Sequence, residues 1–352
     1  MITTNQIKLY LSSALVYSVG YLLVWIEAMP KLVYGIEYAV IKILHILFTR
    51  YDELLPAYRN VLTDDTYKTL FYILIAFLAI SPIYYAEVKG RDAVNKPLLF
   101  LKSLKKIFKW KWKEIKNAEK VAARFLLVKI FFLPLMLQFF VSNYSWLRWH
   151  ASEVEIFATV MALIFAIDTG IFLISYSVEF EFLKNKVKSV EPTIFGWAVA
   201  VMCYPPFNGI VGKFIPWGSN EYTHFWTPEL TNIFRIVIVS LFLIYLAATI
   251  SLGPKASNLT NRGIVSRFPY SIVRHPAYIS KVGVWWVALI PAVYLQFSSG
   301  KWGTGLAFIL GMAFWTLVYY FRAFTEERHL SADPDYLEYK KKVKWKFIPY
   351  VW

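Results

Sequence analysis

The segment A-Y-I-S-K-V-G-V-W-W-V-A-L-I-P-A-V-Y-L-Q-F (277–297) is followed, after five residues, by G-T-G-L-A-F-I-L-G-M-A-F-W-T-L-V-Y-Y-F-R (303–322). Each segment has the length and apolar character of an α-helix that crosses a bilayer, which takes about 20 residues. Because so few residues separate them, the two segments predict a helical hairpin whose outer ends lie on the same side of a membrane.

The rest of the chain has the same apolar character. It is 58% hydrophobic and only 17% charged, whereas about 25% of the residues of a soluble domain are charged. Six more apolar stretches of suitable length occur at 9–28, 69–87, 121–141, 154–178, 194–212 and 232–252. The sequence therefore predicts an all-α integral membrane protein with about eight transmembrane helices. The stretch 32–49 contains charged residues and is predicted to re-enter the membrane or to lie on its surface.

Lysine and arginine are distributed unequally between the two sets of alternate loops. One set carries 24 of these residues and consists of 88–120, 179–193, 253–276 and 323–352. The other set carries 8 and consists of 29–68, 142–153, 213–231 and 298–302. Cytoplasmic loops carry the excess of positive charge. The sequence thus predicts a multi-pass protein with a cytoplasmic C-terminal tail, in the plasma (inner) membrane or, in a eukaryote, the endoplasmic reticulum.

The loop 88–120 is the most basic part of the chain. Apolar residues recur in it at spacings of three and four, namely Leu101, Leu104, Phe108, Trp112 and Ile115. Lysines lie between them, at Lys102, Lys105, Lys106, Lys109, Lys113 and Lys116. This pattern predicts a basic amphipathic helix on a leaflet rich in anionic lipids. The alternative is that the charges only fix the topology. Nucleic-acid binding is not expected, because the aromatic residues occupy the apolar face.

Most familiar catalytic motifs are absent. The chain has no H-E-x-x-H, G-x-S-x-G or Walker sequence, and no glycine-rich dinucleotide motif. It has one cysteine, Cys203, and its five histidines are not at ligand spacing, so no metal site is expected. Asp168 lies inside a predicted span, which makes it a candidate functional residue. A hydrogen bond between helices is the alternative for Asp168.

Polar chemistry is concentrated at the two outer ends of the predicted hairpin. One end carries R-H-P-A-Y (274–278), and the other carries T-E-E-R (325–328). Basic groups and free N–H groups at a helix start can hold a carboxylate or phosphate. A glutamate can accept hydrogen bonds from a ribose diol or pair with an ammonium group. The two ends suit a zwitterionic, hydroxylated ligand such as S-adenosylmethionine. The alternative is a belt of residues that anchors the helix ends at the membrane interface.

Four C-terminal segments carry a family resemblance. They are P-Y-S-I-V-R-H-P-A-Y (269–278), R-A-F-T-E-E-R-H-L (322–330), D-Y-L-E-Y-K-K-K-V (335–343) and F-I-P (347–349). Together they resemble the isoprenylcysteine carboxyl methyltransferase family and its relatives, the phospholipid N-methyltransferases. The resemblance covers about 250–352. It implies a methyltransferase-like membrane domain at 231–352, with a catalytic helical hairpin, after an N-terminal transmembrane region at 1–230.

The resemblance also implies a cofactor, S-adenosylmethionine, and a set of site residues. Arg322 matches an arginine that faces the methyl acceptor, and we expect it to be catalytic. The implied cofactor-binding residues are Arg262, Gly263, Ile264, Val265, Tyr270, Arg274, His275, Pro276, Ala277, Tyr278, Glu326 and Glu327. The chain departs from the family pattern at Phe268 and Ser280, where glycine is usual.

The resemblance leaves the methyl acceptor open. The first expectation is O-methylation of a carboxylate on a prenylated cysteine or another lipid-linked acceptor, and the first alternative is methylation of a phospholipid headgroup or a lipid phosphate. The C-terminal motif and the ending W-K-F-I-P-Y-V-W (345–352) are also similar to those of sterol reductases, which use NADPH. The acidic pair Glu326-Glu327 argues against binding a 2′-phosphate. A transporter is the remaining alternative, although no inverted repeat is evident.

Overall fold

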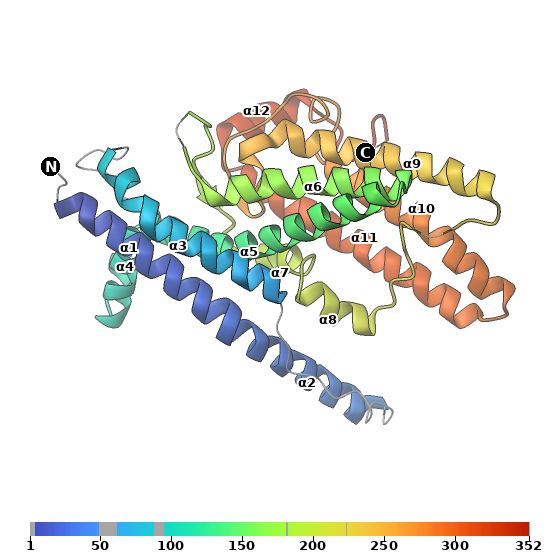
Figure 1. The fold of residues 1–352 in the computed structure, drawn as a ribbon, viewed down its shortest axis with the longest axis horizontal. Coiled ribbons are helices and arrows are strands. Elements are labelled where there is room, and N and C mark those ends of the chain that lie inside the picture. The colour runs from blue at the N-terminus through green and yellow to red at the C-terminus, as the bar shows by residue number, and fades with distance from the viewer. Residues whose placement is uncertain (1–3, 49–61, 88–94, 181, 223, 352) are drawn as a thin grey trace. The chain divides into compact units, whose positions relative to one another are not determined.

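The computed structural model describes residues 4–48, 62–87, 95–180, 182–222 and 224–351 (Figure 1). The chain forms two compact units, Met1–Gln138 and Phe139–Trp352. Nearly all regular structure in the described residues is helical. The predicted functional boundary at residue 230 lies inside the second unit and stays a prediction.

In the first unit, a long helix runs without a break from α1 (Thr4–Tyr21) through the π-helix η1 (Leu22–Ala28) into α2 (Met29–Phe48). The sequence predicts a span at 9–28 and a separate segment at 32–49. The structure corrects this division, because the π-helical turns carry the chain directly into α2. Pro30, which has no N–H to donate, thus lies within a continuous helix.

Helices α3 (Asp64–Glu87) and α4 (Lys96–Phe108) both pack against α1. The Asn95 side chain starts α4 by accepting a hydrogen bond from the Leu98 N–H at 2.9 Å. After α4 the chain forms the short 3-10 helix η2 (Trp112–Glu114) and then enters α5 (Asn117–Ser152).

The single amphipathic helix predicted over 88–120 is therefore wrong for the described part, 95–120. The helix ends because Trp110 adopts a left-handed conformation, with φ of 58°. A new helix begins seven residues later, where the Glu119 carboxylate accepts a hydrogen bond from the Lys116 N–H at 2.8 Å. Residues 88–94 lie outside the described part of the chain.

The second unit is a bundle of long helices (Figure 1). Helix α6 (Ile156–Ser177) packs against α9 (Pro228–Leu252), and α10 (Pro276–Ser298) packs against both α9 and α11 (Trp302–Leu330). The buried core between α6, α9 and α10 includes Met161, Ile238, Phe242 and Val284. Residues 299–301 join α10 to α11, so the two helices run in opposite directions.

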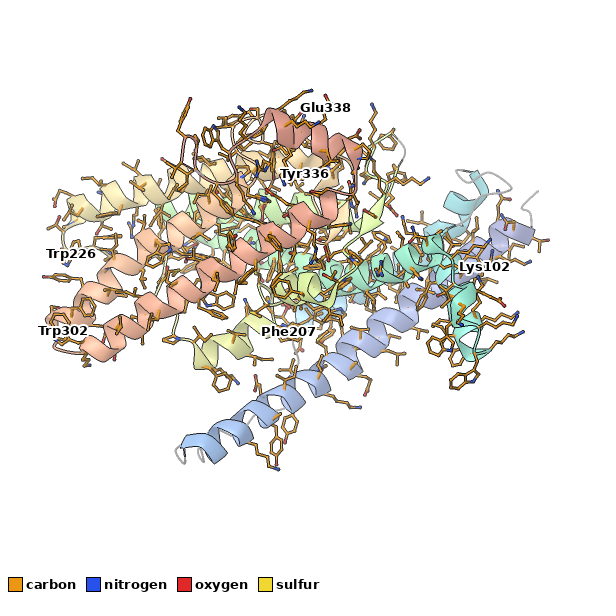
Figure 2. All side chains as sticks on the ribbon, turned by 180° about the vertical axis from the view of Figure 1, so that it is seen from behind. Lys102, Phe207, Trp226, Trp302, Tyr336 and Glu338 are labelled. Atoms are coloured by element: carbon orange, nitrogen blue, oxygen red, sulfur yellow. The ribbon has the colours of Figure 1, made fainter. Side chains whose placement is uncertain are left out.

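Short elements gather at one end of this bundle. Strand β1 (Ser189–Val190) pairs antiparallel with β2 (Thr260–Asn261), and the 3-10 helix η3 (Gly253–Lys255) follows α9. Helix α12 (Pro334–Lys342) follows α11. Figure 2 shows Tyr336 and Glu338 of α12 at this end and Trp226 and Trp302 at the other. The candidate site lies at the α12 end.

Six helices in the described residues are long and apolar enough to cross a membrane: Thr4–Ala39, Asn117–Ser152, Ile156–Ser177, Pro228–Lys255, Pro276–Ser298 and Trp302–Leu330. They confirm the predicted class, an all-α membrane protein with several membrane helices. The predicted number of eight spans is not confirmed over the described residues. The stretch 69–87 lies in α3, which is not among the six over its described residues.

The stretch 194–212 is not one span. It forms two eight-residue helices, α7 (Ile194–Val201) and α8 (Phe207–Phe214), separated by a turn. The break falls at Pro205-Pro206, because proline has no N–H for a helix hydrogen bond and disfavours the helical conformation of the residue before it. Each helix is about 12 Å long, too short for a bilayer.

Candidate functional site

The start of α10 and the end of α11 bring the two predicted motifs together. The Tyr278 hydroxyl donates a hydrogen bond to Glu326 Oε2 at 2.6 Å. Arg274 Nε donates one to Glu327 Oε1 at 2.8 Å, and His275 Nε2 lies 3.1 Å from the same oxygen. Because the helices are antiparallel neighbours, residues about fifty positions apart in sequence become direct partners.

Glu327 is the centre of a buried ion cluster. Its side chain is 8% exposed, like that of its partner Arg274. Its second oxygen lies 3.6 Å from Lys340 Nζ and 3.9 Å from Lys346 Nζ, and both of these lysines belong to the C-terminal tail. The contacts give Glu327 a structural part, since it joins α10, α11 and the tail. Its predicted contact with a cofactor stays a prediction.

Backbone hydrogen bonds hold the tail segment 343–346 against the start of α10. The N–H groups of Arg274 and His275 donate to the carbonyls of Trp345 and Lys346, both at 3.0 Å. The Arg274 guanidinium also donates to the carbonyls of Val343 and Lys344. Burial lowers the pKa of Lys346, and the nearby Glu327 carboxylate acts in the opposite direction. The tail is thus part of the candidate site.

Glu326 has different surroundings from Glu327. Its side chain is 43% exposed and lies 4.0 Å from His275 Nδ1. Glu326, Tyr278 and Arg322 line one small cavity of about 40 Å³. The other lining residues include Glu191, His329 and the segment 257–260. Glu326 therefore presents a partly exposed carboxylate to this small cavity, which the buried cation of Arg322 also lines.

Arg322 is buried, with an exposed fraction of 7%. Its guanidinium lies over the rings of Tyr204, Tyr278 and Tyr319, with 5.2–5.6 Å to the ring centroids. It also donates a hydrogen bond to the Asn258 side-chain oxygen. Among the described residues, no carboxylate lies within 4.0 Å of this guanidinium. Burying a cation without an anion is unfavourable, so the position is suited to an anionic group of a ligand.

Asn258, Tyr204 and Tyr319 are not among the predicted site residues. The Asn258 side-chain amide donates to the hydroxyls of Tyr176, at 2.9 Å, and Tyr204, at 3.1 Å. This amide thereby fixes the oxygen that Arg322 meets. Asn258 lies in the predicted loop 253–276 without a recognisable motif, and the tyrosines lie in apolar stretches. The sequence contains no signal that distinguishes them from packing residues.

The segment Arg262–Val265 divides into parts with different surroundings. Arg262 is 3% exposed and donates to the carbonyls of Ser175, at 2.9 Å, and Asn185, at 3.2 Å. Its visible contacts are therefore with the end of α6 and the loop that follows. Gly263 has a φ of 96°, a conformation that favours glycine. Val265 is half-buried.

Ile264 and Tyr270 form an apolar wall together with the tail helix. Both residues pack against the buried cluster of Tyr336, Tyr339 and Val343. The Tyr339 hydroxyl donates to the Tyr270 carbonyl at 2.8 Å. Burial raises the pKa of Tyr270 and of Tyr339, so both phenols are neutral at physiological pH. Pro276 and Ala277 occupy the first turn of α10, and the His275 ring stacks on Tyr278 at 5.3 Å.

Asp168 has partners on a neighbouring helix. It is 5% exposed and accepts hydrogen bonds from the Tyr245 hydroxyl, at 3.0 Å, and the Thr249 hydroxyl, at 2.6 Å. Both partners lie on α9, while Asp168 lies on α6. The structure thus agrees with the alternative prediction for this residue, a hydrogen bond between helices.

Comparison with known proteins gives no relative for this chain, since no family model, curated protein or solved structure matches it. Within the described residues, no group of three or more His, Cys, Asp or Glu side chains is placed to hold a metal ion.

Proposed function

We propose that this protein is an integral membrane methyltransferase that uses S-adenosylmethionine. The observation that carries the proposal is the arrangement of Glu326, Tyr278 and Arg322 around one cavity at the ends of α10 and α11. It places the partly exposed carboxylate of Glu326 at the same cavity as the buried cation of Arg322, which has no carboxylate within 4.0 Å in the described part of the chain. A zwitterionic cofactor and an anionic acceptor are a chemical match for these two groups.

Residues at the cavity and in the elements around it each have a part in this proposal. S-adenosylmethionine supplies a methyl group on a sulfonium, which an acceptor takes by in-line displacement. Glu326 accepts hydrogen bonds from the ribose hydroxyls or pairs with the ammonium group. Ile264 and Tyr270 provide an apolar surface for the adenine ring. The ion cluster around Glu327 holds the tail, so that the first turn of α10 keeps its position. Orientation of the two reactants supplies most of the rate acceleration.

Arg322 points to an oxyanion as the acceptor. A carboxylate or phosphate next to Arg322 gains a charge-assisted hydrogen bond, whereas an amine must be neutral to attack and gains nothing from a nearby cation. The proposed acceptor is therefore a lipid-linked carboxylate of the isoprenylcysteine type, and the alternative is a phospholipid or lipid phosphate. The acceptor reaches the cavity from the bilayer, and the cofactor reaches it from the cytoplasm. The membrane is the plasma membrane, or the endoplasmic reticulum in a eukaryote.

The first unit has a surface that suits an anionic leaflet. Lys102, Lys105 and Lys109 line an open depression of about 500 Å³ between α4 and the start of α5. Phe108 and Trp110 at the end of α4 are 80% and 83% exposed. Exposed aromatic rings beside lysines are typical of segments that lie in the headgroup region. We include anionic lipids as partners of this surface.

Two experiments test the function. Purified protein in neutral detergent is passed over S-adenosylhomocysteine resin and over NADP⁺ resin. Retention on the first resin alone supports the methyltransferase. Retention on the second resin alone supports the reductase alternative. Glu326 is the main argument against a reductase, because Glu327 is surrounded by basic residues that neutralise its charge. Retention on neither leaves the transporter. A labelled methyl group is then transferred into total membranes, which are separated into lipid and protein fractions to identify the acceptor.

A further inference from the structure

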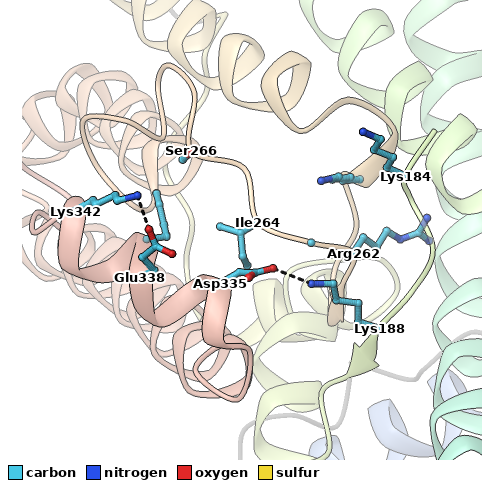
Figure 3. Close-up of a pocket in the computed structure, with 11 residues that line it drawn as sticks. Lys184, Lys188, Arg262, Ile264, Ser266, Asp335, Glu338 and Lys342 are labelled. Carbon is cyan, nitrogen blue, oxygen red and sulfur yellow. Dashed lines mark hydrogen bonds and ion pairs between the residues drawn. The ribbon is translucent and has the colours of Figure 1, made fainter. Parts of the chain in front are cut away.

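A second cavity lies at the same end of the second unit and shares no lining residue with the cavity at Glu326. It is an open groove of about 460 Å³. Its walls come from three parts of the chain, namely the loop after α6, the segment 255–266 and helix α12 (Figure 3). We name it the lysine groove, after Lys184, Lys188, Lys255 and Lys342.

The acidic residues of the lysine groove are already paired. Asp335 lies 3.2 Å from Lys188 Nζ, and Glu338 lies 2.6 Å from Lys342 Nζ, as the dashed lines in Figure 3 show. Lys188 is also bound to Asp333 at 3.0 Å, and this hydrogen bond raises its pKa, so it stays protonated. Two further lysines, Lys184 and Lys255, also line the groove.

Lys184 and Lys255 have no carboxylate within 4.0 Å among the described residues. The positive charges of Lys188, Lys184 and Arg267 instead repel the ammonium group of Lys255. Lys184 adopts a left-handed backbone conformation, with φ of 50°, which is uncommon for residues other than glycine and is often found at ligand sites. Four lysines line the groove against two carboxylates, and this excess of positive charge indicates a place for an anion.

Gly263 leaves room beside Lys255 in the groove. A Cβ atom on Gly263 would lie 3.2 Å from Lys255 Nζ, so a side chain here would crowd the ammonium group. Ile264 and Tyr339 provide apolar surface at the same groove. The groove thus offers cationic groups next to an apolar wall, and its volume exceeds that of a phosphate group alone.

We propose that the lysine groove binds a phosphate monoester that carries an organic group. A monoester has close to two negative charges at neutral pH and three acceptor oxygens, and lysine is a frequent phosphate ligand. Lys184 and Lys255 bind the phosphate, and the organic group lies against Tyr339. The phosphate comes from a lipid headgroup or from a soluble nucleotide. This proposal does not depend on methyl transfer.

The test uses the full chain in neutral detergent. Binding of tritiated AMP is measured by equilibrium dialysis, with adenosine as the uncharged comparison. Dioctanoyl phosphatidate and dioctanoyl phosphatidylcholine are measured in parallel by fluorescence competition. We expect AMP or phosphatidate to bind, and the uncharged or zwitterionic counterpart to bind at least tenfold more weakly. AMP alone would identify a nucleotide source, and phosphatidate alone a lipid source. The proposal is overturned if neither monoester binds the folded protein.

Two double variants separate the site from general charge. The variant Lys184→Gln, Lys255→Gln removes the two lysines that have no carboxylate partner among the described residues, and it should weaken monoester binding at least tenfold. The control Lys341→Gln, Lys344→Gln changes the net charge equally on exposed tail residues outside the groove, and should change affinity less than twofold. If both variants lose monoester affinity equally, the attraction comes from net charge alone, and the lysine groove is not the binding site.

Binding of S-adenosylhomocysteine is followed in the same variants, and unfolding temperatures confirm that they are folded. Affinity for this ligand should stay within twofold in both. A parallel loss in the Lys184, Lys255 variant would place the groove inside the cofactor site and overturn a separate phosphate site. The proposed methyl transfer can fail without affecting the monoester result.

Discussion

Glu326 and Glu327 are neighbours in the sequence, but the side chain of Glu327 is buried in an ion cluster and that of Glu326 is partly exposed at a cavity. Successive residues of a helix point about 100° apart, so Glu327 faces Arg274 and the tail, while Glu326 faces the cavity. The sequence predicts both as cofactor ligands, because the motif contains both. The difference depends on where the tail lies, which the motif does not encode.

The first prediction concerns Glu326. We expect Glu326→Gln to weaken S-adenosylhomocysteine binding ten- to a hundredfold, since a hydrogen bond to a charged group contributes about 1.5–3 kcal/mol. The Tyr278 hydroxyl can still donate to the amide oxygen, so the unfolding temperature should not change. Calorimetric titration measures the affinity. Unchanged binding in the folded variant would remove Glu326 from the proposed cofactor site.

The second prediction concerns Glu327. Glu327→Gln leaves the buried Arg274 without a carboxylate, and we expect it to lower the free energy of unfolding by about 2 kcal/mol. The tail should also become accessible to protease before the bundle does, because the ion cluster fixes segment 343–346. Limited proteolysis followed by mass spectrometry measures this. If stability is unchanged but cofactor binding is lost, Glu327 is a ligand and not a support for the tail.

The third prediction separates Arg322 from the cofactor. Arg322→Lys keeps the positive charge and loses the planar fork that can hold two oxygens. We expect kcat/KM for the acceptor to fall at least tenfold, with S-adenosylhomocysteine affinity within threefold of the wild type. Steady-state kinetics with labelled cofactor check the first and titration checks the second. Equal losses of both quantities would place Arg322 in the cofactor pocket.

At the scale of elements, the long apolar helices could be predicted and the breaks between them could not. The predicted spans at 277–297 and 303–322 lie within α10 and α11. A run of about 20 apolar residues in a membrane forms a helix, because only a helix satisfies all of its backbone hydrogen bonds within the segment. Hydropathy alone does not reveal the break at Pro205-Pro206, which divides 194–212 into α7 and α8. The two prolines are the signal that could have found it.

The fourth prediction concerns the attachment of α12. Asp333 caps this helix, and it accepts hydrogen bonds from Lys188 at 3.0 Å and Asn261 at 2.8 Å. Burial alone would raise the pKa of Asp333, but the hydrogen bonds from Asn261 and Lys188 outweigh it and lower the pKa. A lowered folded-state pKa gives stability that is present above the unfolded value, about 3.9, and is lost as the pH falls through the folded value.

We therefore expect the unfolding temperature of the wild type to decrease below about pH 4. The variant Asp333→Asn keeps a capping side chain and cannot ionise. It should be less stable than the wild type at pH 7, and the difference should become smaller between pH 5 and pH 3. Thermal unfolding of both proteins across this range is the measurement. A difference that stays constant with pH would show that the Asp333 charge does not stabilise the tail.

At the scale of the whole molecule, the chain combines two units with different surfaces. The second unit, Phe139–Trp352, contains all the predicted site residues. The first unit, Met1–Gln138, carries the lysine-rich end of α4 and lacks any predicted catalytic motif. Its charge and aromatic content could be read from the sequence, whereas the turn at Trp110 that exposes the aromatic rings depends on local geometry. If the first unit binds the protein to an anionic leaflet, its lysines and exposed aromatic residues are accounted for.

The last prediction tests whether the first unit binds an anionic leaflet. Lys102, Lys105 and Lys109 are exposed, whereas Lys106 is bound to Glu119 at 2.8 Å and supports the start of α5, so the test leaves Lys106 unchanged. Each lysine near an anionic surface contributes about 1 kcal/mol, and salt screens this attraction. Changing the three exposed lysines to glutamate should raise the apparent KM for a membrane acceptor at least tenfold in anionic vesicles at 50 mM salt, about the ionic strength of a dilute buffer.

The effect should shrink at high salt and be absent in vesicles of neutral lipid, and cofactor affinity should not change. A matched control places the same three charge reversals at Lys301, Lys341 and Lys344, which are exposed outside the region 88–120. Orientation is verified by cysteine accessibility before the kinetics are compared, because the same lysines could act only on insertion. If the α4 variant has normal orientation and its KM equals that of the control in anionic vesicles, the lysines of α4 do not recruit the acceptor. Their positive charge would then serve topology alone, and the acceptor would reach Arg322 without help from the first unit.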